Sequence, residues 1–241
     1  HFVDGAKAVI AGYFAQAISD SEIENPTLLT ISQMITGSYG DPDDLHAKMA
    51  MNDGVGGIAQ RTADRMLSAL KSGSSEYESV RATAIEQTNW LTSLAMAWTL
   101  SHSTFDFREL KGNPGATLYL VIPPQFLDIH KRVLRLFIIL AMTKFPEGGK
   151  SSKSCLFIID EAHSLGRMEE ISRAYGANAS YNMVVWAFFQ DIGQLEKLYG
   201  AEKTTFFANS RATQVFGVTD ATARHESEQL GKRAIESTYL R

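Results

Sequence analysis

The sequence has 241 residues, of which 44% are hydrophobic and 21% are charged, and this balance excludes a disordered or fibrous chain. The formal net charge of -4 argues against a surface that is basic throughout and coats nucleic acid. The lone cysteine, Cys155, excludes an internal disulfide, and no stretch approaches the roughly 20 apolar residues of a membrane helix.

The first predicted element is a helix over residues 3–19, where apolar side chains recur at helical spacing. The sequence opens on His1 and enters this helical pattern at once. We therefore expect the sequence to be a piece of a longer protein.

From residue 20 to about residue 105 the pattern stays helical, and no run in it has the short, β-branched character of a strand. Acidic residues outnumber basic ones in this region, so we expect an acidic all-helical unit. Turn signals divide it at Asn25-Pro26, Gly40-Asp41-Pro42, Asn52-Asp53-Gly54 and Gly73.

After residue 105 short apolar runs alternate with helical stretches. Such alternation predicts an α/β fold with a parallel sheet that helices cover on both faces. The predicted strands are residues 116–122, 155–159, 183–189 and 213–218, and the predicted helices are residues 127–145, 165–178, 191–200 and 220–231.

The run CLFIIDE, residues 155–161, ends in the two acids Asp160 and Glu161. In open α/β sheets, ligands bind at the carboxyl ends of parallel strands. There one acid can hold a Mg²⁺ that bridges nucleotide phosphates, and the next can polarise the attacking water. The alternative is a buried strand that ends in two solvated or helix-capping acids.

The tripeptide Gly149-Lys150-Ser151 spells the end of a phosphate-binding P-loop. A P-loop needs a strand before it, a helix after it and a glycine five residues before Gly149, where Lys144 stands. The nine residues between Lys150 and Asp160 are too few for a helix and a return strand. We interpret the tripeptide as part of a polar turn.

The next predicted strand, MVVWAFFQD, ends in Gln190 and Asp191. An amide at the end of a neighbouring strand can hydrogen-bond a γ-phosphate or its attacking water. Alone, such a glutamine often only caps the following helix. Combined with Asp160 and Glu161 on another strand of the same sheet, it favours a nucleotide site.

Four blocks of the sequence resemble the VirD4/TraG family of type IV secretion coupling proteins, relatives of the FtsK/HerA ring motors. Together they cover most of residues 105–232, in order and at compatible separations. The blocks are FDFRELKGNPGATLYLVIPPQFLD (105–128), FIIDEAHSLGRMEEI (157–171), VVWAFFQDIGQLEKLYG (184–200) and FANSRATQVFGVTDATARHESEQLGK (207–232).

The resemblance implies a RecA-like parallel sheet with flanking helices and an inserted all-α domain. Residues 1–19 would be a helix of the motor domain, residues 20–105 the inserted all-α domain, and residues 106–241 the half of the nucleotide-binding domain that holds the Walker B acids. The Walker A loop and the membrane anchor would lie upstream of His1, and the last motor strands downstream of Arg241. The fragment alone should then hydrolyse ATP poorly.

By the same resemblance Asp160 is the acid associated with Mg²⁺, Glu161 the catalytic base and Gln190 the sensor of the γ-phosphate. Arg211 is a candidate for reaching the ATP of a neighbouring subunit, and its alternative is a surface arginine that supports its loop. The implied cofactors are ATP and Mg²⁺.

The resemblance also implies a homo-hexamer at the cytoplasmic face of the bacterial inner membrane. Its partners would be a complex of single-stranded DNA with a relaxase, or protein effectors, together with components of the secretion channel. Two alternatives stay open. Residues 20–105 could make the protein a module that binds substrates or adaptors, or the protein could be an FtsK/HerA-type DNA pump outside secretion.

Overall fold

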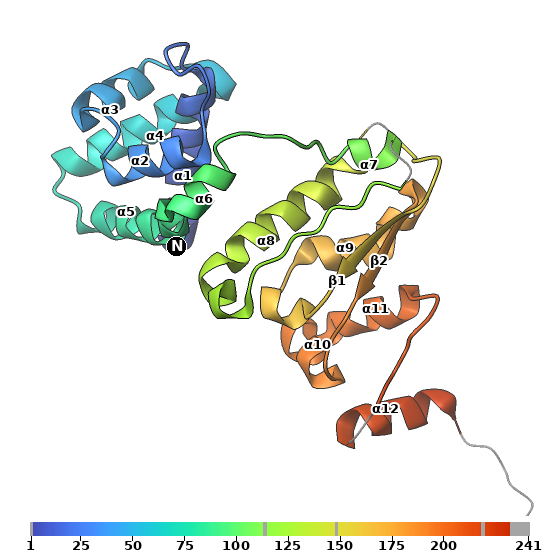
Figure 1. The fold of residues 1–241 in the computed structure, drawn as a ribbon. Coiled ribbons are helices and arrows are strands. Elements are labelled where there is room, and N and C mark those ends of the chain that lie inside the picture. Colours follow the sequence, from blue (N-terminus) through green and yellow to red (C-terminus); the bar gives the residue numbers. More distant parts are fainter. Residues whose placement is uncertain (1, 113–114, 148, 218–219, 232–241) are drawn as a thin grey trace, which may run out of the picture. The chain divides into compact units, whose positions relative to one another are not determined.

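The computed structural model describes residues 2–112, 115–147, 149–217 and 220–231. The chain divides into two compact units, His1–Thr104 and Phe105–Arg241 (Figure 1).

The first unit is helical throughout its described residues, as the pattern of residues 20–105 predicts. Its longest helices pack along one another, with α1 against α2, α4 and α5 (Figure 1). The elements are α1 (Phe2–Ser19), α2 (Leu28–Thr36), α3 (Pro42–Ala50), α4 (Gly54–Lys71), α5 (Ser75–Thr88), a 3₁₀ turn (Asn89–Thr92) and α6 (Leu94–Thr99).

Local capping explains where α2 and α3 begin. Thr27 caps α2 through a reciprocal pair of hydrogen bonds with Thr30, and Asp41 caps α3, where Pro42 stands at the first helical position. Gly37 closes α2 in the left-handed conformation, with φ of +80°. Residues close to each helix end therefore determine where α2 ends and where α2 and α3 begin.

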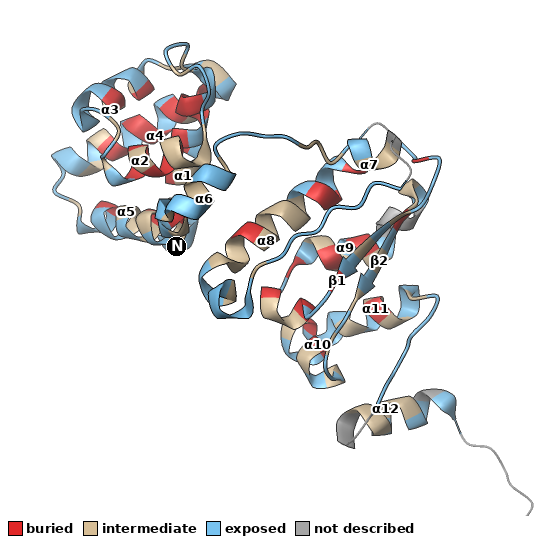
Figure 2. Ribbon diagram, viewed as in Figure 1, coloured by how far each residue is buried: buried red, intermediate tan, exposed pale blue. Residues whose placement is uncertain are grey.

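Helix α1 belongs to the core of this unit. Its residues Ala6, Val9 and Tyr13 are buried against side chains of the other helices, among them Ile31 and Ala59 (Figure 2). We expected residues 1–19 to belong to a different domain from residues 20–105. That assignment stays a prediction, and within the described residues α1 packs with the helices that follow it.

The second unit holds a parallel sheet of two strands with helices on one side (Figure 1). Its elements are α7 (Glu109–Gly112), α8 (Pro124–Lys144), β1 (Cys155–Ile159), a 3₁₀ turn (Ala162–Leu165), α9 (Glu169–Ala177), a 3₁₀ turn (Asn178–Tyr181), β2 (Met183–Ala187), α10 (Ile192–Tyr199), a 3₁₀ turn (Gly200–Glu202), α11 (Lys203–Asn209) and α12 (Asp220–Leu230).

The two strands pair in register from Cys155 with Met183 to Ile159 with Ala187. Side chains alternate between the two faces of a strand. On one face Ile159 and Met183 are buried in a core that includes Phe145, Ile171 and Phe206. The parallel pairing of these two strands, with α9 between them in the chain, agrees with the prediction.

The other face of the sheet is exposed in the described residues. Leu156, Ile158 and Val184 are exposed there, and Trp186 stacks on Phe188 with ring centroids 5.1 Å apart. The prediction that helices cover both faces is therefore wrong for the described part of the chain. Both strands carry apolar side chains on this face as well, but no described helix lies over it (Figure 2).

The predicted strands at residues 116–122 and 213–218 do not form where the structure describes them. Residues 116–122 are an irregular segment in which Tyr119 and Val121 are exposed, and residues 213–217 are irregular too. Val218 lies outside the described residues. A strand needs a neighbour for its backbone N–H and C=O groups, and neither segment pairs with β1 or β2.

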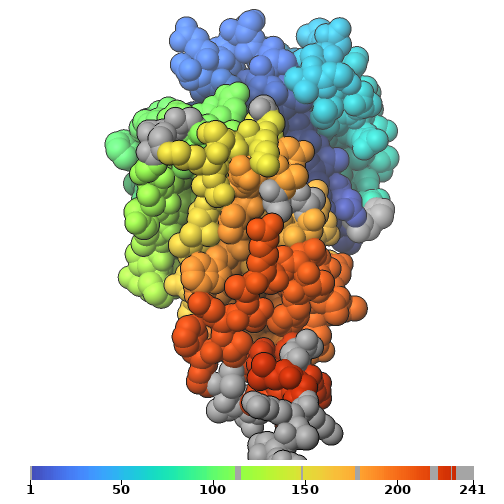
Figure 3. All heavy atoms as spheres, turned by 90° about the vertical axis from the view of Figure 1, so that its right-hand side faces the viewer, coloured from blue at the N-terminus to red at the C-terminus, as the bar shows by residue number. Residues whose placement is uncertain are grey.

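The last described helix, α12, follows residues 211–217 and packs beside α10. The aromatic ring of Phe207 lies 4.8 Å from that of His225. In the space-filling view α12 is red, below the orange segments that precede it (Figure 3). This helix agrees with the predicted helix over residues 220–231.

None of the helices in the described ranges combines the length and the apolar character that crossing a membrane requires.

Candidate functional site

The candidate site lies where β1 and β2 end, at the same edge of the sheet. Asp160 and Glu161 follow β1 directly, and Gln190 comes three residues after β2. Two further backbone bonds hold the strand ends together beyond the ladder: Phe188 N–H donates to Ile159 O, and Ala162 N–H donates to Phe188 O, both at 2.9 Å. Parallel pairing therefore brings together three of the four residues that the resemblance selects.

Glu161 has a backbone conformation that is uncommon for a residue with a side chain. Its φ and ψ are both +47°, in the left-handed region. This conformation costs on the order of 1 kcal/mol for an L-residue, and such outliers gather at functional sites. Its neighbours hold it there, since Ser164 donates to Glu161 O from both N–H and Oγ, each at 2.8 Å. The turn leaves both Asp160 and Glu161 exposed at the strand end.

Gln190 contacts Glu161 directly. Its Nε2 donates to Glu161 Oε1 at 3.4 Å. The next helix holds the same amide, because Gln194 Nε2 donates to Gln190 Oε1 at 3.1 Å and Gln190 N–H donates to Gln194 Oε1 at 3.0 Å. The acid after β1 and the amide after β2 thus form one hydrogen-bonded group.

Asp160 turns one carboxylate oxygen back to the chain, where Oδ1 accepts from Glu161 N–H at 3.0 Å. Its Oδ2 makes no hydrogen bond or ion pair with any other described residue. That oxygen is available to a cation.

Arg211 lies outside this group. It is exposed on the irregular segment before residues 213–217, and no hydrogen bond or ion pair joins it to Asp160, Glu161 or Gln190 in the described structure. Within one chain, therefore, the structure does not bring Arg211 to the other three residues.

Two residues outside the predicted site hold the loop after Glu161. Arg135, from α8, donates through Nη1 to Leu165 O at 2.6 Å and to Arg167 O at 3.0 Å. Tyr199, from α10, donates through its hydroxyl to Met168 O at 3.2 Å. A basic residue inside the apolar stretch of α8 was the available signal for Arg135, because a charge within such a stretch needs partners.

The tripeptide Gly149-Lys150-Ser151 lies in the connection between α8 and β1. Gly149 has φ of +87°, Ser151 N–H donates to Tyr181 O at 3.3 Å, and β1 begins at Cys155. A phosphate loop must lead into a helix N-terminus, and this one leads into a strand. The interpretation as a polar turn is confirmed.

The side chains that could ligate a metal decide whether the site suits Mg²⁺ with a nucleotide. Among the described residues no group of three His, Cys, Asp or Glu side chains could hold a metal ion. Mg²⁺ does not need such a group, because it keeps several waters and binds through one or two carboxylates and the phosphates of a substrate. The exposed Asp160 carboxylate fits that role, whereas no glycine-rich loop leads from a strand into a helix in the described residues to cradle the phosphates.

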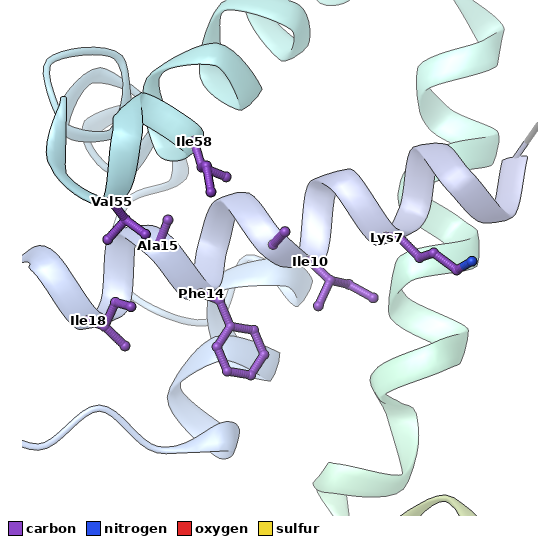
Figure 4. A pocket seen from close by; sticks show the side chains of 8 residues that line it. Lys7, Ile10, Phe14, Ala15, Ile18, Val55 and Ile58 are labelled. Carbon is purple, nitrogen blue, oxygen red and sulfur yellow. The ribbon is translucent and has the colours of Figure 1, made fainter. Parts of the chain in front are cut away.

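The helical unit carries two surface hollows. One, of about 440 Å³, is apolar and lies between α1 and α4, where Ile10, Phe14 and Ile18 line it together with Val55 and Ile58 (Figure 4). The other, of about 420 Å³, is acidic. Its lining includes Asp20, Glu22, Asp41 and Asp44 beside Ile23, Leu45 and Met51, and Lys48 in the same lining pairs with Glu22.

Comparisons with known proteins agree on one family. The profile of a family described as type IV secretory system conjugative DNA transfer matches residues 1–239. The chain is 24% identical over 164 residues to the conjugal transfer protein TraG of Agrobacterium fabrum, covering 66% of this chain and 25% of that protein. It is 26% identical over 237 residues to the protein VirD4 of Rhizobium radiobacter, covering 96% of this chain and 33% of that protein.

Solved structures agree as well. The conjugative coupling protein TrwB in an unbound form has a TM-score of 0.63 and 16% identity, covering 87% of this chain and 46% of that one. TrwB in complex with ADP and Mg²⁺ has a TM-score of 0.60, also at 16% identity, covering 87% and 51%. The likeness confirms the α/β fold class. The chain spans a third or less of the curated relatives quoted and about half of the solved chains.

Proposed function

Because the chain belongs to the family of type IV secretory system conjugative DNA transfer proteins, we propose that it forms the Walker B half of an ATP-driven motor. The motor is a coupling protein that passes substrates to a secretion channel. Its substrates are single-stranded DNA with an attached relaxase, or protein effectors.

The observation that carries the proposal is the meeting of Asp160, Glu161 and Gln190 at the ends of two paired parallel strands, with Gln190 Nε2 3.4 Å from Glu161 Oε1. Two solvated acids at a strand end would need no neighbour of this kind. An acid pair with an amide beside it is what hydrolysis of a phosphoanhydride requires, since it needs a metal ligand, a proton acceptor for water and a polar contact to the γ-phosphate.

Each residue has its own part in the mechanism. Asp160 offers a carboxylate oxygen to Mg²⁺, and Glu161 orients a water molecule and accepts its proton at a carboxylate oxygen. Gln190 holds the Glu161 carboxylate and can report the state of the γ-phosphate to α10, which begins two residues later. Mg²⁺, when bound with ATP, would neutralise the charge that develops on the phosphate oxygens.

The quaternary part of the proposal is a homo-hexamer at the cytoplasmic face of the bacterial inner membrane, attached through segments outside residues 1–241. In such a ring Arg211 would act on the nucleotide of a neighbouring subunit. Support comes from its exposed position away from the acids of its own chain. The TrwB complex with ADP and Mg²⁺ supports ATP and Mg²⁺ as the cofactors.

The test is Glu161→Gln in the full-length protein. The substitution keeps the size of the side chain and removes its basicity, so ATP hydrolysis should fall by about 100-fold or more, with ATP binding retained and substrate transfer lost. Glu169→Gln makes the same change at a nearby exposed carboxylate at the start of α9 and should leave both activities intact. Unchanged hydrolysis in the Glu161 variant would contradict the proposal.

A second candidate function is recruitment of a substrate or adaptor by the helical unit. The acidic hollow favours it, because three carboxylates remain beside three apolar side chains after Lys48 pairs with Glu22, and such a lining suits a basic segment with apolar residues. The two functions are separable. Asp41→Asn combined with Asp44→Asn removes two charges and keeps a capping side chain at the start of α3. It should weaken capture of a basic substrate segment while ATP hydrolysis stays, and Glu161→Gln should do the reverse.

A further inference from the structure

We infer that Gln194 is a positioning residue of the ATPase site, which sets the end of the Gln190 amide that faces Glu161. The inference rests on the proposed function, in which Glu161 accepts the proton of the attacking water. It concerns a residue of α10 that does not itself reach the acids.

The orientation of the two amides follows from one backbone group. Gln190 N–H can only donate, so the Gln194 atom that lies 3.0 Å from it must be the oxygen Oε1. The other end of the Gln194 amide is then Nε2, a donor, and the atom of Gln190 that it meets at 3.1 Å must be the oxygen. The remaining end of the Gln190 amide is Nε2, the atom that donates to Glu161 Oε1. The backbone N–H of Gln190 therefore fixes the orientation of both side-chain amides.

Gln194 is itself held firmly. Its backbone N–H donates at 2.9 Å to Oδ1 of Asp191, the residue that caps α10, and Leu195 beside it is buried in the core. Gln190, by contrast, is exposed after the strand has ended. An exposed amide without partners rotates freely and presents its oxygen as often as its nitrogen. A carbonyl oxygen that faced Glu161 would repel the carboxylate.

Two substitutions together distinguish the role of the amide donor of Gln194 from that of its acceptor. Gln194→Leu removes both. Gln194→Glu keeps an acceptor for Gln190 N–H but places a second acceptor against Gln190 Oε1, so the Gln190 amide should turn over and direct its oxygen at Glu161. Neither change removes the backbone bond to Asp191.

The first measurement is ATP hydrolysis by the full-length protein. Loss of one net hydrogen bond predicts that Gln194→Leu lowers kcat roughly tenfold, with KM for ATP within about twofold, and that Gln194→Glu lowers kcat further. Lys197→Gln is the matched control, because it changes the charge of α10 by the same amount as Gln194→Glu at an exposed residue. The control should behave as wild type. Wild-type kcat in both Gln194 variants would overturn the inference.

A double variant tests whether Gln194 acts through Gln190. In a Gln190→Leu background the change Gln194→Leu should lower kcat no further, because its target is gone. A residue that only supported the fold would lower kcat by the same factor in both backgrounds, and that result would overturn the inference.

A third measurement needs neither nucleotide nor activity. The side-chain amide ¹⁵N–¹H signals of Gln190 in the 241-residue chain, identified from their absence in Gln190→Leu, should shift in both Gln194 variants and stay in place in Lys197→Gln. Unshifted signals would overturn the inference. Failure of the proposed function is distinct, since Glu161→Gln would then leave ATP hydrolysis intact whatever the Gln194 variants do.

Discussion

Gln190 donates a hydrogen bond to Glu161 across the ends of two parallel strands, at 3.4 Å between Nε2 and Oε1. The two residues lie 29 positions apart in the sequence. Strand pairing from Cys155 with Met183 to Ile159 with Ala187 brings them together. The distance is at the long end for a hydrogen bond, so it should respond to a change of one methylene group.

We expect Gln190→Asn to separate the amide from Glu161. The shorter side chain keeps the chemistry of the amide but cannot span the gap between the strand ends. ATP hydrolysis by the full-length protein should fall roughly tenfold, the factor for one net hydrogen bond. Steady-state kinetics would measure it, with Gln60→Asn, at an exposed site on α4, as the control. Wild-type kcat in Gln190→Asn would contradict a role for this contact.

The left-handed backbone of Glu161 predicts that a glycine variant at this position is more stable than an alanine variant. Glycine adopts positive φ without strain, so Glu161→Gly should be more stable than Glu161→Ala by about 1 kcal/mol. The free energy of unfolding in urea measures the difference. At Arg173, in the middle of helix α9, the order should be reversed, because glycine is less favourable than alanine in a helix interior by about 1 kcal/mol. The same order at both positions would refute the strain at Glu161.

Lys150 should be dispensable for ATP hydrolysis. It lies in the turn that leads into β1 rather than into a helix, so it has no place in a phosphate cradle. In the full-length protein Lys150→Ala should keep kcat, while Asp160→Asn, which weakens the site for Mg²⁺, should lower it.

The same interpretation predicts that the 241-residue chain alone has little ATPase activity. A Mg²⁺-dependent activity of that chain that Lys150→Ala abolishes would show that the turn binds phosphate after all.

Gly12 marks a close approach of α1 to α4. A Cβ atom on Gly12 would lie 2.4 to 2.6 Å from the side chain of Thr62. Gly12→Ala should therefore lower the free energy of unfolding by about 1–3 kcal/mol through overpacking. Gly176→Ala is the control, since a Cβ on that helical glycine meets no atom within 4 Å, and it should stabilise the protein by up to about 1 kcal/mol. Equal effects in urea unfolding would refute the close approach.

His46 should make the stability of the helical unit depend on pH. Burial lowers the pKa of His46 below its ordinary value, Arg81 also lowers it, and Asp43 opposes them. A group whose pKa is lowered by folding stabilises the folded state above its unfolded pKa of about 6.5. That stabilisation is lost as pH falls through the pKa of the folded state.

The free energy of unfolding should therefore drop between pH 7.5 and pH 5, and His46→Gln, which cannot titrate, should drop less. The hydroxyl of Tyr13 lies 3.0 Å from His46 Nε2, so His46→Gln also changes this contact and with it the stability at every pH. The quantity compared between wild type and His46→Gln is therefore the change in the free energy of unfolding with pH. Parallel curves for wild type and His46→Gln would contradict the prediction.

The elements whose signals are local could be predicted from the sequence. The predicted strands at residues 155–159 and 183–189 pair in parallel, the second ending at Ala187, and the predicted helical region 20–105 forms helices between the predicted turns. The acids at residues 160 and 161 lie at a strand end. Each depends on side-chain periodicity or turn residues within about ten positions, which a sequence displays directly.

The features that depend on distant neighbours could not be predicted from the sequence. Residues 116–122 have the composition of a strand but no partner, and one face of the sheet stays exposed, because backbone pairing and coverage come from other segments. The direction of the Gln190 amide likewise depends on Gln194, and the Glu161 loop depends on Arg135 and Tyr199 from two other helices. Spacing along the chain placed the chemical groups on the sheet, and contacts across the fold set their geometry.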